Sequence, residues 1–176
     1  MNELNTSRLI GTPAVPGDFA DIRILHADPR VMATLSADGK TFPEQDSRAF
    51  LERAAEHWKL HGFGLWLLRE RLGGEFVGYG GIKHIVVEGR DQIELAYAIR
   101  SDCWGNGFAT EISIAALKLG FDVMRLDRIV AFTLPHNIAS RTVMEKCGFT
   151  YNRDIVHAGL PHVLYILEAR DFTARP

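Results

Sequence analysis

Residues 104–110 read Trp-Gly-Asn-Gly-Phe-Ala-Thr, a stretch with two glycines that separates segments of different periodicity. It follows the alternating run 93–99, which predicts a strand, and it precedes residues 110–123, whose apolar side chains recur at helical spacing. A further strand is expected at 128–133. Strand, glycine loop, helix and strand form a crossover unit, so the two strands are predicted to be parallel.

The remaining strands are predicted to surround this pair in antiparallel fashion. Short runs rich in apolar and β-branched residues, bounded by glycine or proline, lie at 7–14, 64–69, 75–85, 149–157 and 162–170. The last two runs are expected to form a hairpin. A mixed, mostly antiparallel sheet with one splayed parallel pair therefore follows.

The helices are placed by capping residues and by apolar spacing. One is expected at 18–27, and residues 28–40 are predicted to be irregular. The capping box Thr41-Phe42-Pro43-Glu44 is expected to open a long helix that ends near Gly62. Asn137 is the predicted N-cap of a last helix that stops at Gly148. With about four helices beside the sheet, the fold class is α+β.

Composition excludes several classes of protein. The 176 residues are 47% hydrophobic, enough for one core, so a single domain spanning residues 1–176 is expected. The formal net charge is −2 and the basic residues are scattered, which disfavours a nucleic-acid partner. No segment approaches the ~20 apolar residues of a membrane span. The sequence predicts a soluble, cytoplasmic protein without a membrane partner.

The glycine loop indicates anion binding. Gly105 and Gly107 allow backbone amides to approach a ligand, and the following helix contributes the positive end of its dipole. Such a turn suits a pyrophosphate, although a tight turn without a ligand fits these residues equally well. Cys103 and Cys147 lack zinc-ligand spacing, so no metal is expected.

Two nucleotide sites are disfavoured by what the loop lacks. A nucleoside-triphosphate loop requires a lysine at its end, and residues 108–110 contain none. A dinucleotide site requires a third glycine and an acidic residue at the end of the next strand. Here Thr110 replaces that glycine, and Asp127 precedes the strand.

The loop, the strand before it and the Asn137 helix together resemble the GNAT superfamily of N-acetyltransferases, especially its RimJ/RimL-like branch of ribosomal-protein N-terminal acetyltransferases. The phosphate loop of the family resembles residues 104–109, its central strand resembles 93–99, and its Asn-x-x-Ser helix motif resembles 137–149. The resemblance implies acetyl-coenzyme A as cosubstrate. The residues implied to bind it are Ala98, Ile99, Trp104, Gly105, Asn106, Gly107, Phe108, Ala109, Thr110 and Asn137.

The resemblance also implies a catalytic mechanism, in which an amine attacks the thioester directly without a covalent enzyme intermediate. Many relatives supply the proton donor from a tyrosine that corresponds to Met144, which cannot donate. The branch uses the serine that corresponds to Ser140; a hydroxyl bonded to its own helix is the structural alternative. Glu94 is the candidate base, acting through water, and the structural alternative for it is a solvated strand carboxylate. His84, at the end of a preceding strand, is another possible base.

The resulting hypothesis is an N-acetyltransferase that acetylates a primary amine, either a protein N-terminal α-amine or a small-molecule amine. A polyamine acceptor is disfavoured because the segments expected to form the acceptor pocket lack an acidic cluster. The alternative is a catalytically degenerate module that binds acyl-coenzyme A as a sensor, which Met144 keeps open. Family members often form homodimers.

Overall fold

An eight-stranded mixed sheet organises the chain, in the order β1-β2-β3-β4-β5-β6-β8-β7. The computed structural model describes residues 3–36 and 38–173, so the two ends of the predicted domain 1–176 lie outside the described residues. The strands are β1 Leu4–Asn5, β2 Leu9–Pro13, β3 Leu65–Glu70, β4 Phe76–Val87, β5 Arg90–Ile99, β6 Arg128–Thr133, β7 Thr150–His157 and β8 Leu160–Glu168. Only β5 and β6 pair in parallel among these strands, which confirms the predicted sheet.

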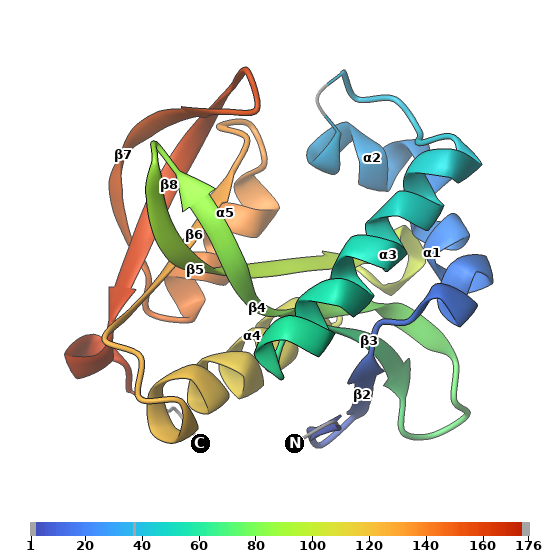
Figure 1. The fold of residues 1–176 in the computed structure, drawn as a ribbon, viewed down its shortest axis with the longest axis horizontal. Coiled ribbons are helices and arrows are strands. Elements are labelled where there is room, and N and C mark those ends of the chain that lie inside the picture. The colour runs from blue at the N-terminus through green and yellow to red at the C-terminus, as the bar shows by residue number, and fades with distance from the viewer. Residues whose placement is uncertain (1–2, 37, 174–176) are drawn as a thin grey trace.

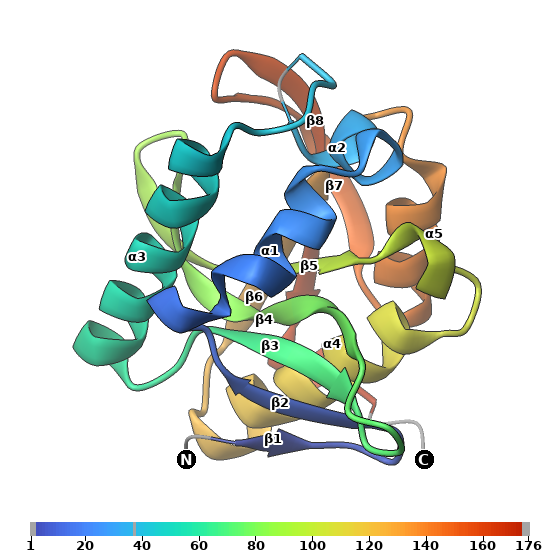
Figure 2. The same cartoon turned by 90° about the vertical axis from the view of Figure 1, so that its right-hand side faces the viewer.

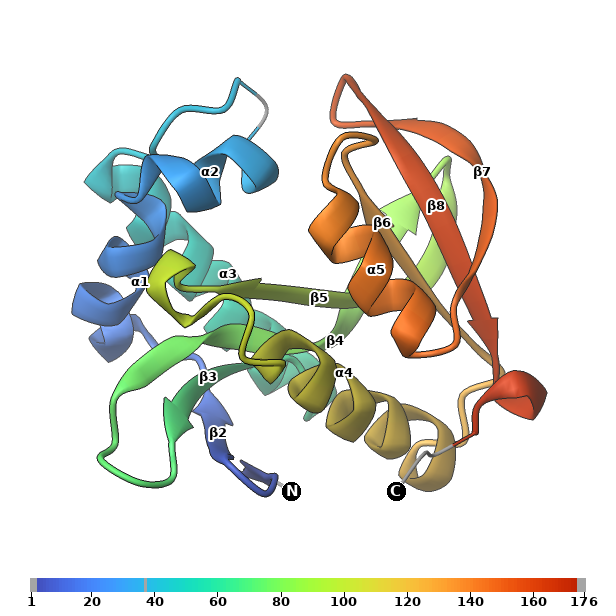
Figure 3. The same cartoon turned by 180° about the vertical axis from the view of Figure 1, so that it is seen from behind.

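Five α-helices cover the two faces of the sheet in the described part of the chain. Helices α1 Phe19–His26, α2 Pro29–Leu35 and α3 Glu44–His61 lie on one side, and α4 Phe108–Lys118 and α5 Ile138–Lys146 lie on the other (Figures 1 and 3). Each layer has its own core. Ile22 and Leu51 pack with Tyr79 on the first face, whereas Ile112 packs with Leu95 on the second.

Helix α2 and the start of α3 differ from the sequence prediction. Pro29 occupies the first turn of α2, and the Asp28 carboxylate accepts a hydrogen bond from the Arg30 amide at 2.8 Å, so this proline begins a helix in a stretch predicted to be irregular. Helix α3 has Pro43 as its N-cap, without a side-chain cap. The predicted capping box is wrong because Pro43 keeps Phe42 out of the helical conformation that a cap at Thr41 requires.

Strands β5 and β6 are paired at a single position, Glu94 with Val130. Beyond it the carboxyl-terminal halves of both strands diverge, as Figure 3 shows from behind the sheet. Figure 2 shows the opposite face of the sheet, where α1 lies across the strands. The predicted splay is therefore present, and it leaves one edge of β5 without a neighbouring strand.

No helix in residues 3–36 and 38–173 combines the length and the apolar character that a membrane crossing requires.

Candidate active site

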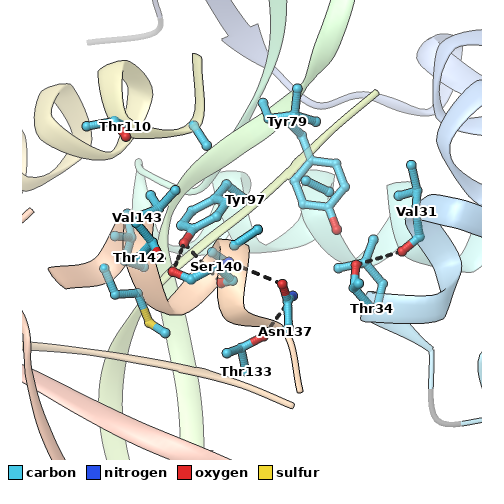
Figure 4. A pocket seen from close by; sticks show the side chains of 18 of the residues that line it. Val31, Thr34, Tyr79, Tyr97, Thr110, Thr133, Asn137, Ser140, Thr142 and Val143 are labelled. Carbon is cyan, nitrogen blue, oxygen red and sulfur yellow. Dashed lines mark hydrogen bonds between the residues drawn. The ribbon is translucent and has the colours of Figure 1, made fainter. Parts of the chain in front are cut away.

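A cavity of about 690 Å³ opens where β5 and β6 diverge. Its lining comes from α2, α3, β4, β5, the glycine loop, β6, α5 and β8, and its volume is within the usual ~300–1,000 Å³ of small-molecule sites. Figure 4 shows Val31, Thr34 and Tyr79 facing Tyr97, Ser140 and Asn137 across it. All the predicted site residues line the cavity except Asn106, which lies at the exposed tip of the loop.

The glycine loop has the geometry of an anion site. Gly105 and Gly107 have φ of 78° and 79°, a left-handed conformation that side-chain-bearing residues rarely adopt. The Glu111 amide donates to the Gly107 carbonyl at 3.0 Å, so α4 starts at the loop. The amides of residues 108–110 consequently have no acceptor within the helix and point toward the loop, where the helix dipole is positive.

Arg8, which no pattern in the sequence indicated, braces this loop from the turn between β1 and β2, far away in the chain. Its guanidinium donates to the Asn106 carbonyl at 2.9 Å and lies over the Phe108 ring at 4.7 Å. It also pairs with the Glu111 carboxylate at 2.6 Å. Burial alone would raise the pKa of Glu111, but hydrogen bonds from Thr6 and Arg8 lower it overall, which keeps the pair charged.

The backbone amides of β5 divide into two sets. Arg100 donates its amide to Val77 of β4 at 2.9 Å, and the register is constant from Gly78–Ile99 onward. Because amides alternate in an antiparallel ladder, the N–H of Ala98 points to β4, while those of Tyr97 and Ile99 point toward the splay. Of these two residues, both implied to bind the cosubstrate, only Ile99 has an amide that is free to face a ligand; Ala98 lines the cavity.

Two hydroxyls meet on the α5 side of the cavity. The Tyr97 hydroxyl lies 3.1 Å from the Ser140 hydroxyl and donates to the Ser140 carbonyl at 3.1 Å (Figure 4). Burial raises the pKa of Tyr97, so its phenol stays protonated at neutral pH. Tyr97 was missed because strand alternation predicts its face but not the helix that covers it. Met144 is buried in the core at 1% exposure.

Asn137 acts as the N-cap of α5, as predicted. Its side-chain oxygen accepts from the Ser140 amide at 3.1 Å, and its side-chain nitrogen donates to the Thr133 hydroxyl at 3.0 Å. These bonds orient the first turn of α5, which carries Ser140. The second N–H of the Asn137 side chain and the second lone pair of its oxygen remain available for a hydrogen bond to a ligand.

Glu94 is not the solvated strand carboxylate that the sequence left open. The residue is 7% exposed, and its Oε2 lies 2.8 Å from Nζ of Lys83, which is directly opposite on β4. It shares its face with Ala96 and Ala98, as alternation predicts. Burial, and then the Glu94 charge, raise the pKa of the neighbouring Tyr79.

Trp104 links the end of β5 to the loop. Its indole donates to the Ile99 carbonyl at 2.8 Å, while the residue is 48% exposed. The ring is thereby held at the mouth of the cavity. Residues 3–36 and 38–173 contain no group of three or more His, Cys, Asp or Glu residues arranged to hold a metal ion.

Comparison with known proteins places this site in context. The family model described as "Acetyltransferase (GNAT) domain" matches residues 8–150. YkkB of Bacillus subtilis is 30% identical over 142 residues, covering 81% of both chains. The FsC-acetyl coenzyme A-N(2)-transacetylase of Aspergillus fumigatus is 29% identical over 136 residues, which is 72% of this chain and 56% of that protein.

The fold is also similar to that of a RimL ribosomal-protein alpha-N-acetyltransferase solved in complex with coenzyme A. The TM-score is 0.75 at 15% identity, and the alignment covers 94% of this chain and 97% of that one.

Proposed function

Because the chain belongs to the GNAT acetyltransferase family, a family of N-acetyltransferases that use acetyl-coenzyme A, we propose that it acetylates a primary amine at the cavity between β5 and β6. The observation that carries the proposal is the combination of an anion-binding loop and a buried hydroxyl pair in one cavity. The acceptor is a small-molecule amine or a protein N-terminal α-amine.

The loop and the splayed strand bind the two ends of the cosubstrate. The free amides of residues 108–110 suit a pyrophosphate, and Arg8 adds positive charge beside them. The amides of Tyr97 and Ile99 face the gap beside β5, where they would hold the thioester carbonyl. The same two donors stabilise the oxyanion that forms as the amine attacks.

The Tyr97–Ser140 pair supplies the proton that the leaving thiolate requires. When the amine nitrogen bonds to the thioester carbon, the carbon–sulfur bond breaks and the thiolate becomes protonated. A serine hydroxyl alone is a weak acid, but the Tyr97 phenol can turn its proton from the Ser140 carbonyl to Ser140 Oγ as that hydroxyl protonates the thiolate. Tyr97 then regains a proton from solvent in the open cavity, which restores the pair. Tyr97 on β5 thereby supplies the acidity that Met144, at the donor position of many relatives, cannot supply.

Glu94 accepts the proton that the amine loses. It is the cavity's one carboxylate among the lining residues of the described chain, and it lies on the face of β5 turned toward α1–α3, opposite the face of Tyr97. Acid and base thus lie on opposite faces of one strand. This arrangement lets the amine enter from the α1–α3 side while coenzyme A leaves from the α4–α5 side.

The proposal is tested by coenzyme A release from acetyl-coenzyme A over a panel of amines, with the acetylated product identified by mass. The expected result is turnover with at least one amine, reduced in Glu94→Gln and Ser140→Ala. Tight binding of acetyl-coenzyme A without turnover over the full panel would instead support the sensor hypothesis.

A further inference from the structure

Lys83 and Glu94 form a charged pair inside the acceptor side of the cavity. They face each other in the β4–β5 ladder and both line the cavity. Oε2 of Glu94 is buried and has no hydrogen-bond partner among the described residues, although Nζ of Lys83 lies 2.8 Å away. The contact is therefore an ion pair that leaves hydrogen-bonding capacity of the carboxylate unused.

The ammonium of Lys83 has unused capacity as well. An ammonium carries three donors, and in residues 3–36 and 38–173 its one carboxylate contact is Glu94. The side chain is 29% exposed, compared with 9% for Glu94, so it is the more accessible of the two. A buried pair of this kind is stable only when further hydrogen bonds satisfy its remaining donors and acceptors. A ligand with a hydrogen-bond donor for Glu94 and an anionic acceptor for Lys83 would satisfy both members of the pair.

The surroundings of the pair are apolar. Tyr79, whose pKa responds to the Glu94 charge, packs against Phe50 with ring centroids 5.1 Å apart. The cavity that the pair lines also includes the apolar side chains of Val31 and Leu35 of α2 and Leu160 of β8. The Glu94 charge also acts on His162, whose pKa is lowered by burial. Low polarity strengthens a charge–charge contact between ligand and pair.

We propose that the acceptor is a free α-amino acid with an apolar side chain, whose amine docks on Glu94 and whose carboxylate docks on Lys83. This inference rests on the proposed acetyl transfer and names its acceptor class. An α-amino acid carries its two charges one carbon apart, which matches the adjacent charges of the pair. The apolar side chain lies against Phe50 and Tyr79.

The same pair disfavours the other acceptors. A polyamine would bring its second positive charge toward Lys83, which repels it. A protein N-terminus offers Lys83 a neutral peptide carbonyl in place of a carboxylate, and charged partners make the stronger hydrogen bonds.

The test compares the twenty free L-amino acids with their α-amides as acceptors, because an amide keeps the amine and side chain but removes the negative charge. Both kcat and KM are measured by coenzyme A release. At least one apolar amino acid is expected to be acetylated with kcat/KM at least about tenfold above its amide, chiefly through KM. A calorimetric titration of that amino acid into the enzyme–coenzyme A complex gives a binding readout independent of turnover.

The variant Lys83→Met removes the proposed carboxylate anchor, and Lys83→Arg retains it. We expect Lys83→Met to raise KM for the free acid roughly 10–100-fold while KM for the amide changes less than about twofold, with rescue by Lys83→Arg. Lys59→Met is the matched control, because its side chain is 79% exposed on α3. A merely structural ion pair would instead affect acid, amide and acetyl-coenzyme A binding alike.

Two outcomes overturn the inference. If amides or N-terminal peptides are acetylated as well as the free acids, the acceptor class is wrong while the proposed acetyl transfer stands. If acetyl-coenzyme A binds but no acid, amide or other amine is acetylated, the proposed transfer fails and the inference fails with it.

Discussion

The hydroxyls of Tyr97 and Ser140 lie 3.1 Å apart, although 43 residues separate them in the chain. Tyr97 comes from the central strand β5 and Ser140 from the first turn of α5, and Asn137 fixes that turn by capping it. The contact couples the strand proposed to bind the thioester to the helix proposed to protonate the thiolate. A serine alone would offer a poor proton donor at this place.

Removal of either hydroxyl should therefore slow acetyl transfer. We expect Tyr97→Phe and Ser140→Ala each to lower kcat by about 10²-fold, since general acid catalysis contributes about 10²–10⁴-fold. The double variant should be little worse than either single one because the two groups act as a unit. Steady-state kinetics and acetyl-coenzyme A binding by calorimetry check this, with binding expected to change little. Full activity of Tyr97→Phe would remove it from the mechanism.

The left-handed conformation of Gly107 should be essential for binding acetyl-coenzyme A. Gly107→Ala places a Cβ at φ of 79°, which costs roughly 1–2 kcal/mol and crowds the approach of a phosphate. We expect the dissociation constant for coenzyme A to rise at least tenfold. Gly17→Ala is the control, because an added Cβ there meets nothing within 4 Å. Equal affinity of both variants would argue against the loop as the pyrophosphate site.

Arg8 should contribute to the same affinity by holding the loop. Arg8→Ala removes the contacts to Asn106, Phe108 and Glu111, and we expect coenzyme A to bind roughly 5–20-fold more weakly, with a smaller dependence on salt. Arg128→Ala is a matched control: each arginine side chain is 49% exposed and paired with a glutamate. Coenzyme A is titrated into each variant at two ionic strengths, because added salt screens the contribution of a charge but does not restore a misfolded loop. Equal effects of the two variants would exclude a specific role.

The stability of the α1–α3 layer should fall in mild acid because of His26. Burial first, and then the charge of Arg23, lower the pKa of His26 to about 4 from its ordinary value of 6.5. Because the pKa of His26 is lower in the folded chain, this residue binds more protons in the unfolded chain. Its contribution to the free energy of unfolding is therefore complete above about pH 6.5 and is lost as the pH falls toward 4. The loss should reach roughly 3 kcal/mol.

Urea unfolding at pH 5 and pH 8 measures the part of this loss that falls between those pH values, about 2 kcal/mol for a pKa lowered from 6.5 to about 4. In His26→Gln the difference between the two pH values should shrink relative to the parent chain. The other histidines remain in both proteins, so the comparison isolates position 26. An unchanged difference would assign the acid sensitivity elsewhere.

Local patterns were sufficient for most of the fold. Alternation predicted the strands around residues 93–99, the glycine loop marked the start of α4, and Asn137 predicted the cap of α5; the family resemblance they supported is confirmed by the matching family model. The errors were also local. Pro29 occupies the first turn of α2, in a segment predicted to be irregular, and Pro43 is the N-cap of α3, where the predicted capping box put it inside the helix.

The sequence by itself determined the glycine loop, the polarity of each strand face and the helix cap, because these depend on neighbours within a few residues. Only the tertiary structure decided the contacts of Arg8 with Asn106, Tyr97 with Ser140, and Lys83 with Glu94. Strand register and helix packing set such pairs, and both depend on long-range burial. The loop, the strand before it and the Asn137 helix together carried the resemblance that predicted the cosubstrate, whereas the fold assembled the side chains proposed to choose and acetylate the acceptor.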